Sequence, residues 1–444
     1  MSYVFHCDTR AEMPVVVRGD GIWIEDATGK RYLDASGGAA VSCLGHSHQR
    51  VIEAVREQVG RIAFAHTGAF SSEPAEQLAE VMVRNAPGRM ARALFVSGGS
   101  EATEAAIKLA RQYHVERGEP SRHRIVARRQ SYHGNTLGAL SASGNMARRA
   151  LYQPYMQDWS HIAPCYPYRG RRHDETEEQY GRRVADELET EILRVGPETV
   201  SAFILEPVVG ATLGAVAAVP GYLARVREIC DRHGVLLIFD EVMCGMGRTG
   251  TLYASEADGV VADVYIVAKG LGAGYQPIGA VIASEKVYGA IRDGSGFFQH
   301  GHTYMGHPVA CAAALAVQTA IREEGLLGRV QSGGAKLRAM LEERFGNAAH
   351  VGEIRGRGYF VALELVADRA SKTPYDPSLA VHQRVKREAM ARGMICYPMG
   401  GIIDGKSGDH VLVAPPYIAS DEDLAEIVDR LGAAVDAAIG SIAG

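Results

Sequence analysis

The sequence predicts an α/β protein whose large domain carries a mostly parallel sheet covered by helices. Three observations support this fold class. The 444 residues are too many for one small core. Short apolar runs alternate with amphipathic stretches from about residue 92 onward, and this pattern changes again beyond about residue 324. We expect residues 60–325 to form the large domain, and residues 1–59 and 326–444 to form a smaller α+β domain.

The composition is that of an ordinary globular chain, and it argues against a nucleic-acid partner. Hydrophobic residues make up 47%, charged residues make up 22%, and the formal net charge is -5. These values are typical of folded proteins without a polyanion-binding surface, so we expect no nucleic-acid partner. The seven cysteines occur singly, without a C-x-x-C pair. Neither a disulfide framework nor a zinc ribbon is therefore indicated.

The sequence also predicts a soluble, cytoplasmic protein. The first ten residues, MSYVFHCDTR, carry charges early and lack the apolar segment of a signal peptide. The longest weakly polar stretch, residues 308–321, is too short to span a bilayer. Together with the scattered cysteines, these features favour a reducing compartment and no membrane contact.

In chain order, the first predicted element is a β-hairpin. Residues 21–34 alternate apolar and polar side chains around a turn at residues 26–29. A helix is expected over residues 49–60. The apolar runs that follow predict strands, and they are residues 92–96, 125–127, 202–205, 235–239, 263–268 and 278–283.

Helix boundary signals separate these strands. Ser100 is expected to cap a helix that ends at Gly118. Pro220 is expected to open a helix that ends at Gly234, immediately before the next strand. Pro308 is expected to begin a helix rich in small residues.

The last part of the chain predicts a second, smaller set of elements. A long helix is expected after Glu324, followed by strands over residues 359–365 and 411–414. A final helix is expected with Ser420 as its cap and Asp423 at the third position. These elements, with the N-terminal hairpin, are the predicted smaller domain.

Chemically informative residues follow the predicted strands directly. In open α/β sheets, ligands bind beyond the carboxyl ends of the strands, so these residues are expected at one edge of one sheet. They are Gly99 and Ser100, Tyr132 and His133, Glu206, Asp240 and Val242, and Lys269. An anion site, an aromatic ring, two acids and a lysine would then share that edge.

Each of these signals has a structural and a chemical interpretation. Residues 97–100 form either a simple turn or, through bare amides at a helix N-terminus, an anion site. Asp240 ends an apolar strand, where a carboxylate requires a cation or a hydrogen-bond donor, so a structural ion pair remains an alternative. Lys269 follows five apolar or aromatic residues, and a lysine in an apolar pocket loses its proton and becomes a nucleophile.

Two further patterns point to other classes of protein. Residues 245–250 spell G-x-G-x-x-G after a strand, which would indicate a dinucleotide site. The segment after it is not the long apolar helix that this fingerprint needs. Five histidines include two H-x-H pairs, and they are His46, His48, His300, His302 and His307. No acid or cysteine completes a metal-ligand set with them, so we expect no metal.

Taken together, the motifs resemble those of a known family across nearly the whole chain, in order. They are SGGSEATEAAIKLAR, SYHGNT, LEPVVG, IFDEVMCGMGRTG, VAKGLGAG, HGHTYMGHPVACAAALA and APPYI. This set is similar to that of the class III aminotransferases, the ω-amino acid, ornithine and GABA type. Members are fold type I enzymes that use pyridoxal 5'-phosphate.

The resemblance implies a role for each strand-end residue. Lys269 would hold the coenzyme as a Schiff base, and Gly99 and Ser100 would bind its phosphate. Tyr132 would stack on the ring and Val242 would pack on the opposite face. Asp240 would face the pyridine nitrogen and keep it protonated, so that the ring can act as an electron sink. Beside these lie His133 and Glu206, which we also expect at the cofactor.

The resemblance also implies a homodimer with shared active sites. Thr303 is similar to the threonine that reaches the phosphate of the neighbouring subunit's cofactor. Whether dimers pair into tetramers is left open by the sequence.

The chain departs from the family pattern in one informative place. Members that act on amino acids carry an arginine shortly before the P-P pair, and this arginine clamps a carboxylate. Between Tyr397 and Pro415 this chain has no arginine and only Lys406. Carboxylate recognition must therefore come from elsewhere or be weak. Ala39 and Ala40 stand where amine-specific relatives carry a bulky aromatic, which hints at a roomier pocket.

The resulting expectation is a transaminase that moves an amino group from a primary amine or ω-amino acid, or an amino acid, to a small 2-oxo acid. One alternative keeps the cofactor and changes the reaction to racemisation or amino migration. A remote alternative is a nucleotide-dependent oxidoreductase that uses the glycines at 245–250. A reaction that requires an amino acceptor would distinguish the transaminase from the racemase or aminomutase. A pyridoxyl group fixed on Lys269 by borohydride reduction would distinguish both from the oxidoreductase.

Overall fold

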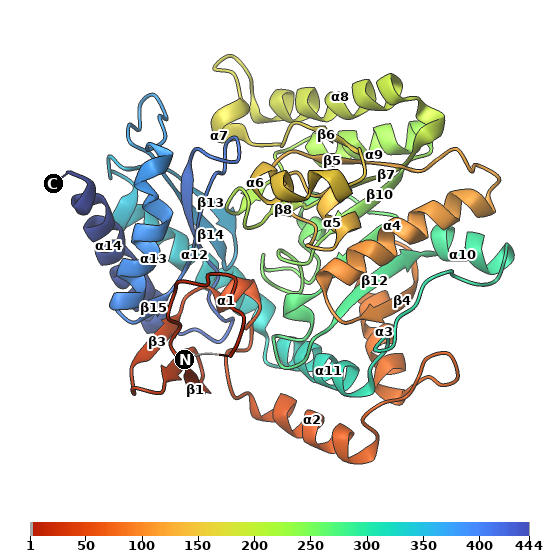
Figure 1. Cartoon of the computed structure of the whole chain (residues 1–444), viewed down its shortest axis with the longest axis horizontal. Helices are drawn as coiled ribbons and strands as arrows, with labels where there is room; N and C mark the ends of the chain where they lie inside the picture. Colours follow the sequence, from red (N-terminus) through yellow and green to blue (C-terminus); the bar gives the residue numbers. More distant parts are fainter. Residues whose placement is uncertain (1–2, 444) are drawn as a thin grey trace.

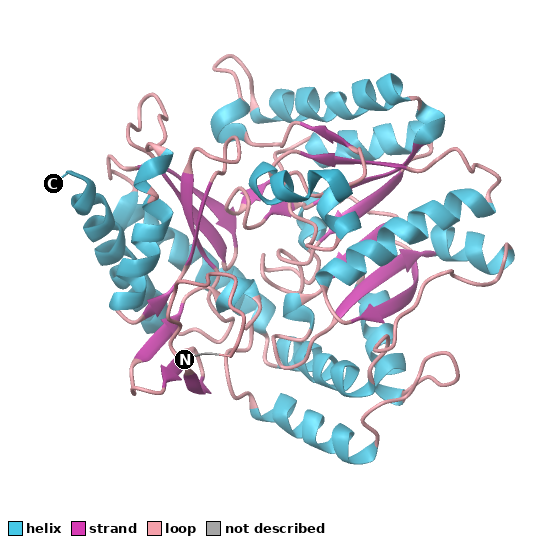
Figure 2. Ribbon diagram, in the orientation of Figure 1, coloured by secondary structure: helices cyan, strands magenta, loops and turns pink. Residues whose placement is uncertain are grey.

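The computed structural model describes residues 3–443 and contains a large sheet at its centre. Within these residues, seven strands form this sheet (Figure 2). In spatial order they are β4 (Met90–Val96), β12 (Gly279–Ser284), β11 (Val264–Val267), β10 (Leu236–Asp240), β7 (Val200–Leu205), β5 (Arg124–Arg128) and β6 (Ser160–Ile162). The expected α/β class and mostly parallel sheet are confirmed.

One strand of this sheet runs against the others. β12 pairs antiparallel with both β11 and β4, whereas the pairs from β11 to β6 are all parallel. Because β4 and β11 are both antiparallel to β12, they run in the same direction. The carboxyl ends of β4, β11, β10, β7 and β5 therefore share one edge of the sheet, where a ligand is expected in this class of fold.

Helices cover both faces, because successive strand residues point to opposite sides. Leu237 and Phe239 of β10 pack in one core, and Leu236 and Ile238 pack in the other. The first core takes residues from α3 (Glu73–Asn85), α8 (Glu177–Val195) and α9 (Tyr222–His233). The second takes residues from α4 (Gly99–Glu116), α5 (Leu137–Ala142) and α10 (Glu285–Asp293).

The two ends of the chain meet in a second region. β15 (Met394–Ile395) pairs parallel with β3 (Arg31–Asp34), and so extends the hairpin strands β2 (Trp23–Asp26) and β1 (Val16–Asp20). Figure 1 shows this N-terminal part beside α13 (Val381–Ala391) and α14 (Asp421–Ala443), away from α4 and α10. The N-terminal hairpin is confirmed, and the domain boundaries at 60 and 325 stay predictions.

A further antiparallel sheet belongs to the C-terminal part. Its order is β13 (Val351–Arg357), β14 (Phe360–Leu365), β17 (Asp409–Val413) and β16 (Tyr397–Gly400). The long helix α12 (Leu326–Phe345) packs against α14 and β13. Between the two regions, α2 (Gln49–Arg61) packs on α11 (Pro308–Glu323), which Pro308 begins as expected.

Helix ends differ from the sequence-based expectation in two places. Ser100 does not cap α4, because Gly98 is the N-cap and Ser100 already lies in the first turn. α9 begins at Tyr222, after Gly221, which adopts a left-handed conformation as its N-cap. At α14 the expectation is confirmed, since the Ser420 hydroxyl accepts from the Asp423 N–H at 3.0 Å. Across residues 3–443, none of the helices has the length and apolar character needed to cross a bilayer.

Candidate active site

One cavity of about 410 Å³ lies at the carboxyl edge of the large sheet. Five strands deliver side chains to it, because their carboxyl ends converge there. The predicted site residues that line it are Gly99, Ser100, Tyr132, His133, Glu206, Asp240, Val242 and Lys269. The structure therefore brings together residues that are up to 170 positions apart in the sequence, from Gly99 to Lys269.

Thr303 is the predicted site residue that this cavity does not include. It lies in the segment before α11 and is exposed. Its hydroxyl is therefore available to another molecule rather than to the cavity of its own chain.

The start of α4 forms the anion-binding end of the cavity. Gly98 caps the helix without a side-chain hydrogen bond, so amides of the first turn lack a partner inside the helix. The Ser100 hydroxyl exchanges hydrogen bonds with Asn135 at 2.9 and 3.1 Å. A Cβ on Gly99 would come within 3.0 Å of Val242, so a side chain there would crowd the cavity wall. Bare amides at a helix N-terminus favour a phosphate or another anion.

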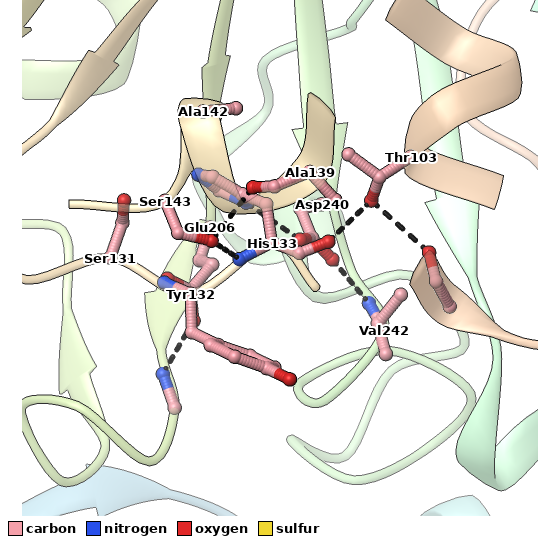
Figure 3. Close-up of polar contacts among 12 residues, drawn as sticks. Thr103, Ser131, Tyr132, His133, Ala139, Ala142, Ser143, Glu206, Asp240 and Val242 are labelled. Atoms are coloured by element: carbon pink, nitrogen blue, oxygen red, sulfur yellow. Dashed lines mark hydrogen bonds and ion pairs between the residues drawn. The ribbon is translucent and has the colours of Figure 1, made fainter. Parts of the chain in front are cut away.

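Asp240 and His133, which both line the cavity, form a buried pair (Figure 3). Both residues are 3% exposed, and the distance between His133 Nδ1 and Asp240 Oδ2 is 2.7 Å. An ionised carboxylate only accepts, so His133 donates from Nδ1. Asp240 Oδ1 also accepts from the Val242 N–H at 3.0 Å. These two bonds fix the carboxylate and leave lone pairs for a ligand in the cavity.

His133 is itself held in place by two neighbours. Its backbone N–H donates to the Ser143 hydroxyl at 2.7 Å, and its backbone carbonyl accepts from the Thr103 hydroxyl at 2.7 Å (Figure 3). The Nε2 atom of its ring is buried without a hydrogen-bond partner in residues 3–443. His133 is thus a positioning residue for Asp240 in this arrangement.

Glu206 closes another side of the cavity. Its two carboxylate oxygens accept from the N–H groups of Tyr132 at 3.1 Å and Gly210 at 2.8 Å. Burial raises the pKa of Glu206, and the charge of Asp240 raises this pKa further. Two acids therefore lie in one poorly solvated cavity, which favours a positive charge between them.

Lys269 follows β11 with a backbone φ of 46°, in the left-handed region that non-glycine residues seldom adopt. Burial lowers the pKa of the Lys269 amine to about 8, against the raising effect of Asp240 and Glu206. The amine makes no hydrogen bond within residues 3–443. A neutral, unpaired amine is a nucleophile and a base, so the cavity contains a reactive group near physiological pH.

The glycine run at 245–250 has a different role from the one a dinucleotide site requires. It follows β10 but leads only to a short 3₁₀ turn, η3 (Ala254–Asp258), and not to a long helix. Arg248, within this run, is buried and donates to the Pro415 carbonyl at 2.5 Å. The run thus ties the large sheet to the C-terminal part, and the nucleotide interpretation is wrong because the phosphate-binding helix is missing there.

Sequence reasoning missed two residues that lie next to Tyr132. The Arg148 guanidinium lies 4.7 Å from the centroid of the Tyr132 ring. Tyr397 of β16 is close enough that its charge would raise the pKa of Tyr132. No motif marks either residue, because α6 (Met146–Arg149) and β16 reach this place only through the fold.

The cavity as a whole suits a planar, phosphorylated ring that reacts with amines. An anion site at the α4 N-terminus lies across from a buried carboxylate, and the reactive amine of Lys269 lies beside them. A carboxylate can hold a proton on a basic ring nitrogen, and an amine can attack a carbonyl carbon. These groups do not form the three-residue set of a serine or cysteine hydrolase.

Comparison with known proteins gives a consistent result. A family model described as aminotransferase class-III matches residues 7–435. An uncharacterized aminotransferase of Schizosaccharomyces pombe is 42% identical over 442 residues, which cover 99% of this chain and 96% of that protein.

Solved structures agree in fold. A thermostable (S)-enantioselective ω-transaminase from Thermomicrobium roseum is 37% identical with a TM-score of 0.89, covering 98% of this chain and 94% of that one. The ω-transaminase from Pseudomonas jessenii in complex with PMP is 34% identical with a TM-score of 0.93, covering 99% and 97%.

Proposed function

We propose a substrate class for this chain, which belongs to the class III aminotransferases and is a pyridoxal-phosphate-dependent transaminase. In this proposal it moves an amino group from a primary amine or ω-amino acid to a small 2-oxo acid. The observation that carries this proposal is the unpaired Lys269 amine, with a pKa of about 8, beside the buried Asp240 and His133 pair. The missing arginine between Tyr397 and Pro415 favours donors that need no carboxylate clamp at that position.

The residues of the cavity fit pyridoxal phosphate. The uncapped start of α4, with Gly99 and Ser100, would hold the phosphate. Asp240 would hold a proton on the pyridine nitrogen, and it has lone pairs free to do so after its bonds to His133 and Val242. Tyr132 and Val242 line the same cavity and would enclose the ring. When bound, this coenzyme withdraws electrons from the substrate's Cα, so that a proton can leave that carbon.

Lys269 has two roles in the proposal. Its amine would hold the coenzyme covalently, and Nζ would become free once an amine substrate takes its place. The released Nζ then takes the proton from the substrate's Cα as a general base. Burial supports this role because a pKa near 8 leaves a useful fraction of the amine neutral at neutral pH. Asp240 and Glu206 stabilise the positive charge that Nζ gains.

We also propose a homodimer, two domains and a cytoplasmic location. The exposed Thr303, outside its own cavity, supports a contact with the partner subunit's phosphate site. The pairing of β3 with β15 supports a smaller domain built from residues 1–59 and 326–444. All seven cysteines lie within residues 3–443 and are free thiols, which supports a reducing compartment. Cross-linking of a Thr303→Cys variant tests the first of these.

Two experiments test the function. Borohydride reduction of the holoenzyme followed by peptide mass mapping should place the coenzyme on Lys269, and an adduct elsewhere would contradict the site. A panel of amines and amino acids with pyruvate or 2-oxoglutarate should then show amino transfer that depends on the acceptor. Turnover without any acceptor would indicate racemisation or amino migration instead.

A further inference from the structure

The substrates of a transaminase include a 2-oxo acid, so the protein must bind a carboxylate near the cavity. Among the described residues that line the cavity, Lys269 is the only cation, and it is engaged with the coenzyme in the proposed function. The nearby buried arginine, Arg248, donates to the carbonyls of Pro415 and Tyr359. Arg149 donates to the carbonyls of Leu140, Ser141 and Ser143. Both guanidinium groups have backbone partners, although Nε and Nη2 of Arg248 are buried without a partner in residues 3–443. Arg248 packs on the Tyr417 ring, 4.7 Å from its centroid, and is not among the residues that line the cavity.

We propose that Arg148 binds the carboxylate of the acid substrates. Its guanidinium lies 4.7 Å from the centroid of the Tyr132 ring, and Tyr132 lines the cavity. The side chain is exposed and forms no ion pair within residues 3–443. This assignment rests on the proposed function, because it names the group that recognises the acid substrates of that site.

The contact with Tyr132 orients Arg148 without using up its charge. A guanidinium placed over an aromatic ring keeps its charge. Arg148 also hydrogen-bonds the Tyr132 side chain, and the remaining N–H groups of its five suit a carboxylate with two parallel hydrogen bonds. The backbone at Arg148 is also fixed, since its N–H donates to the Asn145 side chain at 3.0 Å at the start of α6. The guanidinium is thus held by a short, anchored helix beside Tyr132, which lines the cavity, while Arg148 itself is not a lining residue.

The charge of Arg148 reaches the reacting groups. It opposes the burial that raises the pKa of Tyr132, and it contributes to the lowered pKa of Lys269. Arg248 also lowers the pKa of Lys269, and more strongly. A positive charge at Arg148 that acts on both Tyr132 and Lys269 is near enough to attract a substrate carboxylate while the substrate's reacting carbon is near Lys269.

Lys406 is the competing cation, and it is less well suited. It lies in the loop between β16 and β17, which approaches α6 where Gly405 meets Met146. Lys406 is exposed, and its backbone N–H donates to Asp404, a carboxylate within two residues. A lysine also offers a point charge rather than a planar fork, so it recognises a carboxylate less specifically.

The test compares acid and amine substrates in the holoenzyme. For wild type, Arg148→Gln, Arg148→Lys, Lys406→Gln and Arg387→Gln, kcat/KM is measured with pyruvate, with 4-aminobutanoate and with the uncharged-tail donor 1-phenylethylamine. Arg387 is an exposed arginine on α13 and controls for loss of one positive charge. Arg148→Gln should lower the ratio of acid to amine kcat/KM by about 10- to 100-fold. Arg148→Lys should recover part of the loss.

Binding gives a second readout that does not need turnover. Calorimetry on the holoenzyme compares pentanoate with its uncharged analogue pentanamide. Wild type should prefer pentanoate, and Arg148→Gln should lose that preference while Arg387→Gln keeps it. An unchanged acid-to-amine ratio in Arg148→Gln, or the same loss in Lys406→Gln, would overturn the assignment. If wild type transfers no amino group but still prefers pentanoate through Arg148, the proposed function fails and the carboxylate site stands.

Discussion

Two buried groups of charged residues in this molecule are built in opposite ways. The Glu364 cluster, formed by Glu364, Arg355, Arg169 and Tyr166, joins the C-terminal sheet to the segment before α8. Glu364 accepts from Arg355 at 2.5 Å, from Arg169 at 2.7 Å and from the Tyr166 hydroxyl. The Lys269 cluster, formed by Lys269, Asp240, Glu206 and His133, lines the cavity and leaves the lysine amine without a hydrogen bond in the described chain.

The pKa directions of the two clusters reflect this difference. Burial raises the pKa of Glu364, but the charges of Arg355 and Arg169 outweigh it, so the net shift is downward. In the Lys269 cluster burial prevails, since the pKa of Glu206 is raised and that of Lys269 is lowered to about 8. Similar burial therefore gives a stable ionic joint where hydrogen bonds are complete, and a reactive site where they are not.

The largest expected effect on kcat comes from removing the Lys269 amine, which has no hydrogen bond in the described chain. Lys269→Ala should lower the kcat of amino transfer by about 10⁴-fold or more, because covalent binding and proton transfer are both lost. The melting temperature of the apoprotein should not fall, since no hydrogen bond of that amine is broken. Steady-state kinetics and scanning calorimetry measure the two quantities. The exposed Lys386 provides the control variant Lys386→Ala. A Lys269→Ala variant that keeps a tenth of wild-type kcat would contradict the claim that the Lys269 cluster is the reactive one.

The Glu364 cluster should respond in the reverse manner. Glu364→Gln leaves two arginines without their shared carboxylate, so the free energy of unfolding should drop by about 3–5 kcal/mol. Glu353→Gln removes the other carboxylate that pairs with Arg355. The Glu353 side chain is 27% exposed, so this change should cost less than about 1 kcal/mol. Urea unfolding followed by circular dichroism measures both. Equal losses in the two variants would show that completeness of bonding does not set the stability.

A third variant removes charge from the Lys269 cluster while keeping its shape. Asp240→Asn should lower kcat by about 10²–10³-fold, the range seen when one electrostatic group of an active site is lost. Its unfolding free energy should stay close to wild type, because the amide oxygen accepts from Val242 and the amide nitrogen donates to His133 Nδ1 when that ring carries its proton on Nε2. Asp263 is a buried aspartate that pairs with Arg227 and Lys286. Asp263→Asn should show the opposite result, with stability lost and kcat retained.

The smallest expected effect is a pH dependence. In the proposed function only the neutral amine of Lys269 would bind the coenzyme covalently, and a lowered pKa of about 8 means that the neutral fraction rises with pH and levels off above 8. The rate of capture by the apoprotein should therefore rise about tenfold per pH unit below pH 7, and stay flat from pH 9. Stopped-flow absorbance measures this rate. A rate that still climbs between pH 9 and 10 would indicate a solvated lysine.

The Lys269 cluster could be predicted from sequence because each member follows a strand. Parallel strands end at one edge, so an apolar run followed by Asp240 or Lys269 already places these residues together. The reversal of β12 could not be predicted, since an apolar run carries no direction. The cap of α4 was placed two residues too late, at Ser100 instead of Gly98, because the signal for a cap and the signal for a first-turn serine are the same.

The Glu364 cluster left no signal in the sequence at all. Tyr166 and Glu364 are 198 positions apart, and a glutamate in an apolar strand is compatible with either a surface position or a buried pair. Arg148 was missed for a related reason, because carboxylate recognition was sought between Tyr397 and Pro415 and not on a short helix behind Tyr132. Contacts made only by the assembled fold have no local pattern to reveal them.

The left-handed backbone of Lys269 affects which substitution is favoured at this position during evolution. An L-residue in this region is strained by about 1 kcal/mol relative to glycine. In a duplicated gene freed from the reaction, the change Lys269→Gly would relax the backbone and remove an unpaired, partly buried amine at once. Selection for folding alone would therefore erase this lysine early. A descendant that carries glycine at position 269 can be expected to have kept the fold and abandoned the chemistry.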